Sequence, residues 1–149
     1  MEIVYKLVTS PSDILVLIGK KANYRSLHFL YTSENIKKYQ HLVTDRTAYQ
    51  LIGYSPLGKF VGFISSSEKD FFPNYLFLGE LFVDQKYQGQ GIATSFVQRI
   101  IEYAKRKNLE GVVTETELEN IPAQKLYEKC GFNIVENPNW QGGTYKLHF

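Results

Sequence analysis

A glycine-containing turn between a strand and a helix is the feature that most limits how this chain can fold. Residues 75–83 read YLFLGELFV, and their aromatic and β-branched content favours a buried strand. Apolar residues recur at helical spacing over residues 93–104, which predicts a helix with one face in the core. Residues 88–93, between the two elements, read QGQGIA. Such a turn lets the backbone approach a ligand closely and directs the free N–H groups of the helix start toward an anion.

Two well-known phosphate turns fit this segment poorly. The nucleotide-hydrolase form needs Lys and then Ser or Thr after its last glycine, where this chain has Ile92 and Ala93. The dinucleotide form needs three spaced glycines in a repeated unit, and only Gly89 and Gly91 are present. An ordinary turn that uses its glycines for tight packing stays open as an alternative.

Two motifs in sequence order resemble one known family. Residues 83–94 read VDQKYQGQGIAT and resemble the acetyl-CoA-binding motif of the GCN5-related N-acetyltransferases. Residues 120–132 read NIPAQKLYEKCGF and resemble the second signature of that family, with the strand-like GVVTET between the motifs. The resemblance covers about residues 48–136 well, whereas residues 1–45 match weakly.

This resemblance implies how a cofactor is held. The amides of the turn would bind the pyrophosphate of coenzyme A, and the strand before it would pair through its backbone with the pantetheine arm. The side chain of Asn120 would contact that arm and also cap the following helix. The cofactor-binding residues that the resemblance implies are Leu81, Phe82, Val83, Gln88, Gly89, Gln90, Gly91, Ile92, Ala93, Thr94, Asn120 and Tyr127.

The predicted fold class is α/β (α+β), a single acetyltransferase domain over residues 1–149. Its expected architecture is a mixed central sheet with helices on both faces, in the order β-α-α-β-β-β-α-β-α-β-β. Residues 20–30 are ambiguous between the two types of element. Strands are expected at 2–8, 48–54, 59–66, 75–83, 111–116, 132–135 and 144–149, and helices at 10–18, 32–39, 91–107 and 121–129.

The reaction implied by the resemblance is direct attack of an amine on the acetyl thioester, without a covalent enzyme intermediate. Tyr127 would then be the general acid that protonates the leaving thiolate. The alternative is a core tyrosine, because Ala123, Leu126 and Cys130 share its helical face.

The general base is less well defined by the sequence. Glu80 stands between Leu78 and Leu81, where a carboxylate is out of place unless it is used or paired, and partial burial would suit it to accept a proton. Glu115 and Glu117 are alternates. A dedicated base is unnecessary if the substrate amine arrives partly neutral.

Acceptor recognition is expected from aromatic residues outside the two motifs, in a chain with 11 Tyr and 10 Phe. Each of these side chains could equally serve packing. The candidates are Tyr24, His28, Phe29, Tyr31, Phe72 with its neighbour Phe71, and Trp140.

Composition narrows the class of protein further. A net charge of +2 is too small to indicate nucleic acid or an anionic membrane as a partner, and no apolar run is long enough to span a bilayer. The single Cys130 excludes an internal disulfide and is expected to be a buried small apolar side chain. No metal-binding spacing exists, so no metal is expected. A reducing, cytoplasmic location follows as an expectation.

The sequence thus predicts an acetyl-CoA-dependent N-acetyltransferase acting on a primary amine of a small molecule. A protein or peptide amine is the alternative acceptor, and a homodimer is left open. A sensor that binds acetyl-CoA without turnover and a nucleotide-binding domain are the alternatives outside the enzyme class.

Overall fold

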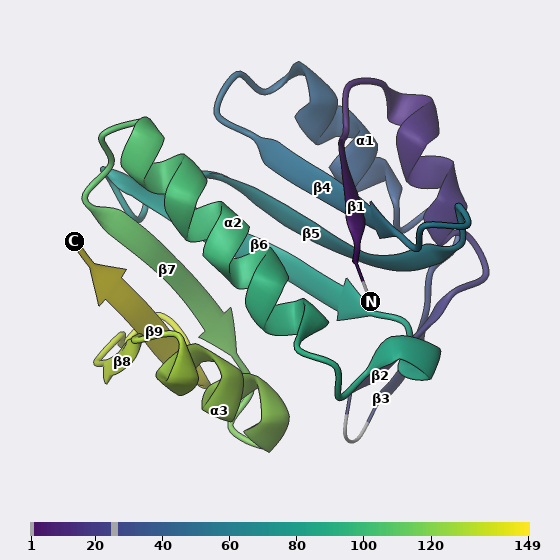
Figure 1. Ribbon diagram of the computed structural model, residues 1–149. Coiled ribbons are helices and arrows are strands. Elements are labelled where there is room, and N and C mark those ends of the chain that lie inside the picture. The colour runs from purple at the N-terminus through teal and green to yellow at the C-terminus, as the bar shows by residue number, and fades with distance from the viewer. Residues whose placement is uncertain (1, 25–26) are drawn as a thin grey trace.

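One mixed sheet organises the chain (Figure 1). The computed structural model describes residues 2–24 and 27–149, and for residues 22–24 and 27–29 it describes the backbone alone. The strands of this sheet are β1 (Val4–Leu7), β4 (Tyr49–Tyr54), β5 (Phe60–Glu68), β6 (Tyr75–Val83), β7 (Gly111–Thr116), β8 (Asn133–Val135) and β9 (Gly143–His148). They lie in the order β1-β4-β5-β6-β7-β9-β8, and β6 and β7 are parallel.

Short helices and one long helix connect these strands, and a separate hairpin pairs β2 (Lys21–Tyr24) with β3 (Leu27–Leu30). The α-helices are α1 (Lys37–His41), α2 (Ile92–Arg106) and α3 (Ile121–Lys129). The 3-10 helices are η1 (Pro11–Leu17), η2 (Leu42–Thr44) and η3 (Gln85–Tyr87). No helix among the described residues is long and apolar enough to cross a bilayer.

Helices cover both faces of the sheet and give the protein two apolar clusters. On one face, α2 contributes Phe96, Val97 and Ile100, all fully buried against β5, β6 and β7. On the other face, η1 and the segment leading into α1 contribute Ile14, Leu17 and Ile36. The predicted arrangement of a mixed sheet between helices is therefore confirmed.

A bulge at Gly79 in β6 changes which face its later residues occupy. Ser65 of β5 pairs with Glu80 and Ser66 pairs with Leu78, so Gly79 has no partner across the ladder. Leu76 and Leu78 before the bulge pack on the α2 side, and Leu81 and Val83 after it do the same. Unbroken alternation would have put Glu80 on the α2 side with Leu78. The bulge instead turns Glu80 and Phe82 toward the α1 side.

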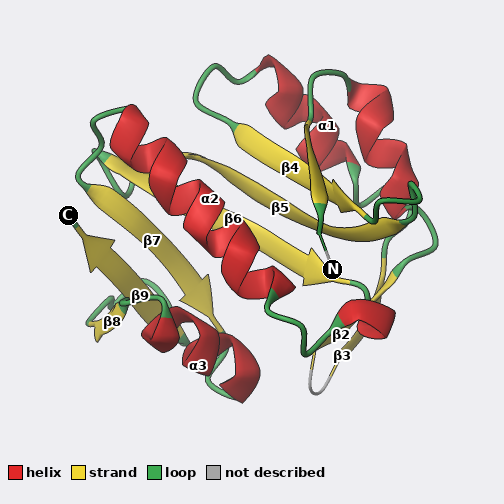
Figure 2. Cartoon of the chain, in the orientation of Figure 1, coloured by secondary structure: helices red, strands yellow, loops and turns green. Residues whose placement is uncertain are grey.

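The parallel pair β6–β7 separates halfway along its length. The strands pair only from Tyr75 to Leu78 and from Gly111 to Thr114, and their later halves diverge toward the arrowheads in Figure 2. The hydroxyl of Thr114 donates a hydrogen bond of 2.8 Å to the carbonyl of Leu78 at the last paired position. This separation opens a space between the start of α2 and α3.

Most predicted elements match the structure within two residues, and the N-terminal third differs. Residues 10–18 were expected to be an α-helix, but Pro11–Leu17 forms a 3-10 helix. The Asp13 carboxylate accepts N–H bonds from Thr9 and Ser10, which fixes the start of this 3-10 helix. The ambiguous residues 20–30 contain the β2–β3 hairpin, and the helix expected over 32–39 is the single turn Lys37–His41.

Candidate active site

A large cavity, about 950 Å³, lies where β6 and β7 diverge. The ends of both strands, the glycine turn, the first residues of α2 and one side of α3 all line it. Trp140, in the loop between β8 and β9, closes another part of the wall, and its indole N–H donates to the carbonyl of Thr116 at 3.4 Å. Both sequence motifs therefore face the same space.

Gly91 starts α2 in a conformation that leaves the first amides of the helix free. Its φ of 78° lies in the left-handed region, and the first hydrogen bond of the helix runs from the Ser95 N–H to the Gly91 carbonyl at 3.1 Å. Gly89 also has a left-handed φ, of 77°. A Cβ placed on either glycine would meet nothing within 4 Å, which argues against tight packing as their purpose. The amides before Ser95 are available to an anion.

Local hydrogen bonds fix the shape of the turn before Gly89. The Asp84 carboxylate caps η3 by accepting the Lys86 N–H at 3.0 Å. The Gln88 side-chain amide donates to the carbonyl of Val83 at 3.1 Å, so the turn is tied back to the end of β6. The turn is thus held by its own residues.

The start of α3 is held by the cap that the sequence predicted. The Asn120 side-chain oxygen accepts the N–H of Ala123 at 3.2 Å. The Gln124 side-chain amide donates to the carbonyls of Glu117 and Leu118, which secures the loop from β7. These contacts fix the angle at which α3 presents Tyr127 to the cavity.

Tyr127 is buried, with 5% of its surface exposed, and packs near the rings of Phe132 and Tyr145. Burial raises the pKa of its hydroxyl to about 12, while a hydrogen bond with Thr114 opposes the rise and the charge of Glu80 adds to it. The hydroxyl is therefore protonated at neutral pH and can donate a hydrogen bond into the cavity.

Glu80 lies half-buried on the boundary between the two faces of the sheet and lines the cavity. Its carboxylate accepts a hydrogen bond of 2.5 Å from the hydroxyl of Tyr39 in α1. Glu115 also lines the cavity, and burial raises the pKa of its carboxyl group. Glu117 lines it too but is exposed.

A second, smaller cavity of about 220 Å³ opens beside α1 and shares Gly79 with the first. We call it the α1 groove. The other residues that line it are Lys38, Tyr39, Leu42, Ser65, Ser66, Ser67, Lys69 and Phe77.

The large cavity brings together most of the residues predicted to form the site. Those that line it are Glu80, Leu81, Val83, Gln88, Gly89, Gly91, Ile92, Ala93, Thr94, Glu115, Glu117, Asn120, Tyr127 and Trp140.

Other candidates lie elsewhere. Gln90 is exposed and does not line the large cavity. Phe82 and Tyr31 pack edge to face in the apolar cluster on the α1 side. Phe72 stacks on Phe77 with Phe71 beside it. The side chains of Tyr24, His28 and Phe29 lie outside the described part of the chain.

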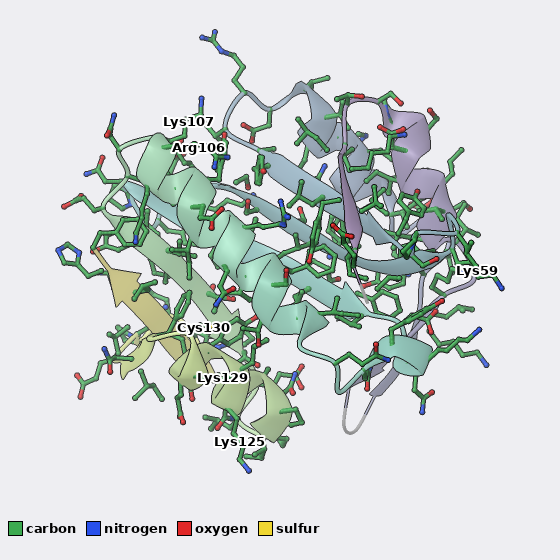
Figure 3. The ribbon with its side chains drawn as sticks, viewed as in Figure 1. Lys59, Arg106, Lys107, Lys125, Lys129 and Cys130 are labelled. Atoms are coloured by element: carbon green, nitrogen blue, oxygen red, sulfur yellow. The ribbon has the colours of Figure 1, made fainter. Side chains whose placement is uncertain are left out.

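Several lining residues were not predicted, including Tyr87, Thr114 and Thr116. Lys129, which was part of the second motif, also lines the cavity and was not predicted as a site residue. Figure 3 shows it on α3 beside Cys130, with Lys125 projecting outward. Cys130 is only half-buried, and burial raises the pKa of its thiol. No group of His, Cys, Asp and Glu side chains suited to a metal occurs among the described residues.

Comparison with known proteins gives consistent matches. The profile of the Acetyltransferase (GNAT) family matches residues 19–132. N-acetylaspartate synthetase from Xenopus tropicalis is 34% identical over 95 residues, which cover 60% of this chain and 34% of that protein. N-alpha-acetyltransferase 30 from Xenopus laevis is 35% identical over 128 residues, covering 86% and 44%. The alignments therefore span less than half the length of these relatives.

A solved structure has a similar fold over its whole length. The PaiA N-acetyltransferase from Thermoplasma acidophilum, in complex with coenzyme A, superposes with a TM-score of 0.75 over 100% of both chains. Its sequence identity is 15%, so the likeness concerns the fold.

Proposed function

This chain belongs to the acetyltransferase (GNAT) family, and from that membership we propose that it transfers the acetyl group of acetyl-CoA to the primary amine of a small molecule. One observation carries the proposal. The cavity where β6 and β7 diverge is lined at once by the glycine turn, Tyr127 and Glu80. Bound acetyl-CoA supplies an activated acetyl thioester, and the net reaction forms an amide and releases a thiol.

The residues of the turn fit a phosphorylated cofactor. Free amides at the start of α2 and the positive end of its dipole favour an anion, and the space a Cβ would fill at Gly89 and Gly91 is open. Lys129 adds a positive charge to the lining. The unpaired edge of β6 beyond Leu78 offers backbone groups to an extended chain in the manner of an added strand.

Glu80 is proposed to accept the proton that the attacking ammonium must lose, directly or through water. Its position supports this role, since the bulge at Gly79 brings it to the boundary between the large cavity and the α1 groove. The hydrogen bond from Tyr39 fixes the orientation of the carboxylate.

Tyr127, expected from the sequence to be the general acid, is proposed to act on the leaving sulfur through a hydrogen bond. A pKa of about 12 makes complete proton transfer to a thiolate unfavourable, because an ordinary thiol has a pKa of about 8.5 and each unit corresponds to ~1.4 kcal/mol. Its hydroxyl therefore stabilises the developing charge by sharing its proton in a hydrogen bond through the transition state. The proton taken up by Glu80 can reach the thiol later through water.

The acceptor has two candidate classes. A relative named for N-alpha acetylation covers 86% of this chain, which favours a protein N-terminus as the alternative acceptor. A small molecule is preferred here because the α1 groove, at about 220 Å³, has room for a compact amine. An acetyl-CoA sensor without turnover is the alternative outside the enzyme class, and it would have no use for a thiolate-stabilising hydroxyl or an oriented carboxylate.

The decisive experiment measures free-thiol release from acetyl-CoA across amino acids, polyamines, aminoglycosides and short peptides. Trp140 is the only tryptophan in the chain and lines the cavity, so its fluorescence reports acetyl-CoA binding independently of turnover. Amine-dependent thiol release supports the proposal. Tight binding without release from any amine supports the sensor, and no binding removes the proposal altogether.

A further inference from the structure

The α1 groove has a charge pattern that the proposed reaction leaves unexplained. Among the described residues that line it, only Lys38 and Lys69 are charged, and both are cations. The ion pairs among the described residues are Lys6–Asp13 and Lys37–Glu34, so neither lysine of the groove forms an ion pair with a described carboxylate. The groove is therefore a positively charged site.

Two of the three serine hydroxyls that line the groove are already committed to other partners. The Ser65 hydroxyl donates to the Gln50 side-chain oxygen at 2.7 Å, and the Ser66 hydroxyl donates to the carbonyl of Tyr49 at 2.8 Å. Both hydroxyl protons are therefore used in hydrogen bonds within the sheet. The ammonium groups of Lys38 and Lys69 are the charged donors left for a ligand.

Contacts of Tyr39 join this positive end to the reaction centre. The Lys38 ammonium lies 5.1 Å from the centroid of the Tyr39 ring, and the Tyr39 hydroxyl donates to the Glu80 carboxylate. Gly79 lines both cavities. Two cations thus line the groove, and the Glu80 carboxylate lies next to it, hydrogen-bonded to the lining residue Tyr39.

We infer that the α1 groove binds the acceptor and that the acceptor is a small amino acid, with its amine toward Glu80 and its carboxylate between Lys38 and Lys69. The inference rests on the proposed acetyltransferase function. A zwitterion matches the two ends of the groove in sign, whereas a polyamine would place a second ammonium against the lysines. We therefore expect the groove to select amino acids over diamines.

The test compares amines of equal length whose second end group is a carboxylate, a neutral amide or an ammonium. A series of ω-amino acids of increasing chain length is assayed beside their amides and the diamines of equal length. We expect kcat/KM for the preferred amino acid to exceed that of its amide by about tenfold or more, with the diamine poorest. The doubly substituted variant Lys38→Glu with Lys69→Glu should reverse the order of amino acid and diamine. Lys37→Glu is the matched control, because Lys37 precedes Lys38 but pairs with Glu34, and it should keep the original order.

Two binding measurements separate failure of this inference from failure of the proposed function. Trp140 fluorescence follows acetyl-CoA, and calorimetry follows each amine on the protein saturated with coenzyme A. If acetyl-CoA binds and amines are acetylated, but diamines are preferred or the double variant keeps the original order, the inference is overturned and the function stands. If no amine is acetylated, the function fails, and calorimetry decides the inference alone. Weaker binding of the amino acid to the double variant than to the wild type then supports the inference. Equal binding of amino acids, amides and diamines, or no binding of any of them, overturns it.

Discussion

The hydroxyl of Tyr39 donates a hydrogen bond of 2.5 Å to the carboxylate of Glu80, joining α1 to β6 between the two cavities. The residues are 41 positions apart in sequence. They meet because the bulge at Gly79 turns Glu80 away from the α2 side of the sheet. An oriented carboxylate beside an open groove is what a base for an incoming amine requires.

Removing the Tyr39 hydroxyl should slow turnover without loosening the cofactor. Tyr39→Phe keeps the edge-to-face packing on Phe63 but deletes the donor that orients Glu80. Because hydrogen bonds to charged groups contribute about 1.5–3 kcal/mol, we expect kcat to fall by on the order of tenfold. Acetyl-CoA affinity, measured by Trp140 fluorescence, should stay unchanged. A fall in that affinity equal to the fall in kcat would show that Tyr39 supports the fold of the cavity instead.

Replacement of the two candidate bases should distinguish them. Glu80→Gln preserves an acceptor for the Tyr39 hydroxyl but cannot take up a proton, so kcat should fall roughly a hundredfold or more. Glu115→Gln is the matched control on β7, since Glu115 lines the same cavity and burial raises the pKa of its carboxyl group. We expect it to retain most of the activity. The reverse result would assign the base to Glu115. Wild-type activity in both variants would mean that no dedicated base is needed.

Removal of the Tyr127 hydroxyl should affect the chemical step. Tyr127→Phe preserves the ring contacts with Phe132 and Tyr145 and removes the only polar group of this side chain. The expected fall in kcat is on the order of a hundredfold to ten-thousandfold, with little change in acetyl-CoA affinity. Pre-steady-state thiol release measures this step directly. An acetyl thioester whose thiol has a lower pKa, and so leaves more easily, should partly rescue the variant, and turnover equal to wild type would remove Tyr127 from the mechanism.

A side chain at Gly91 should block the cofactor specifically. Gly91 and Gly58 have φ values of 78° and 82°, and a Cβ at either position would meet nothing within 4 Å. Valine at either site therefore imposes a similar backbone cost, roughly 1–2 kcal/mol, and should lower stability alike. Gly58 lies in the turn between β4 and β5, away from the cavity lining. Only Gly91→Val should abolish the fluorescence response of Trp140 to acetyl-CoA, and an unchanged response would mean that the anion site lies elsewhere.

Features that depend on local spacing could be predicted from the sequence. The apolar period from Ala93 to Ala104 predicted α2, and the structure has that helix over Ile92–Arg106. Asn120 was predicted to cap α3, and its side chain accepts the N–H of Ala123. Both features are determined by residues within a few positions of one another.

Features that depend on distant partners could not be predicted. The bulge at Gly79 is defined by the register of β5, which no local pattern encodes. The α1 groove requires Lys38 and Lys69, 31 positions apart in sequence, to line one cavity. Tyr31 was expected in an acceptor pocket and is instead 1% exposed in a core cluster, because burial of an aromatic ring and contact with a ligand look alike in sequence.

The start of η1 should make stability depend on pH in the acid range. Hydrogen bonds from the Thr9 amide and from Lys6 lower the pKa of Asp13 from 3.8 to about 2. A carboxyl group with a lowered folded-state pKa stabilises the protein above its unfolded-state pKa, and this stabilisation is lost as the pH falls from about 4 toward 2. Asp13→Asn should therefore lower the free energy of unfolding at pH 7, with the gap to wild type closing near pH 2. Urea denaturation of both proteins across this range measures the gap, and a constant gap would show that the charge of Asp13 contributes nothing.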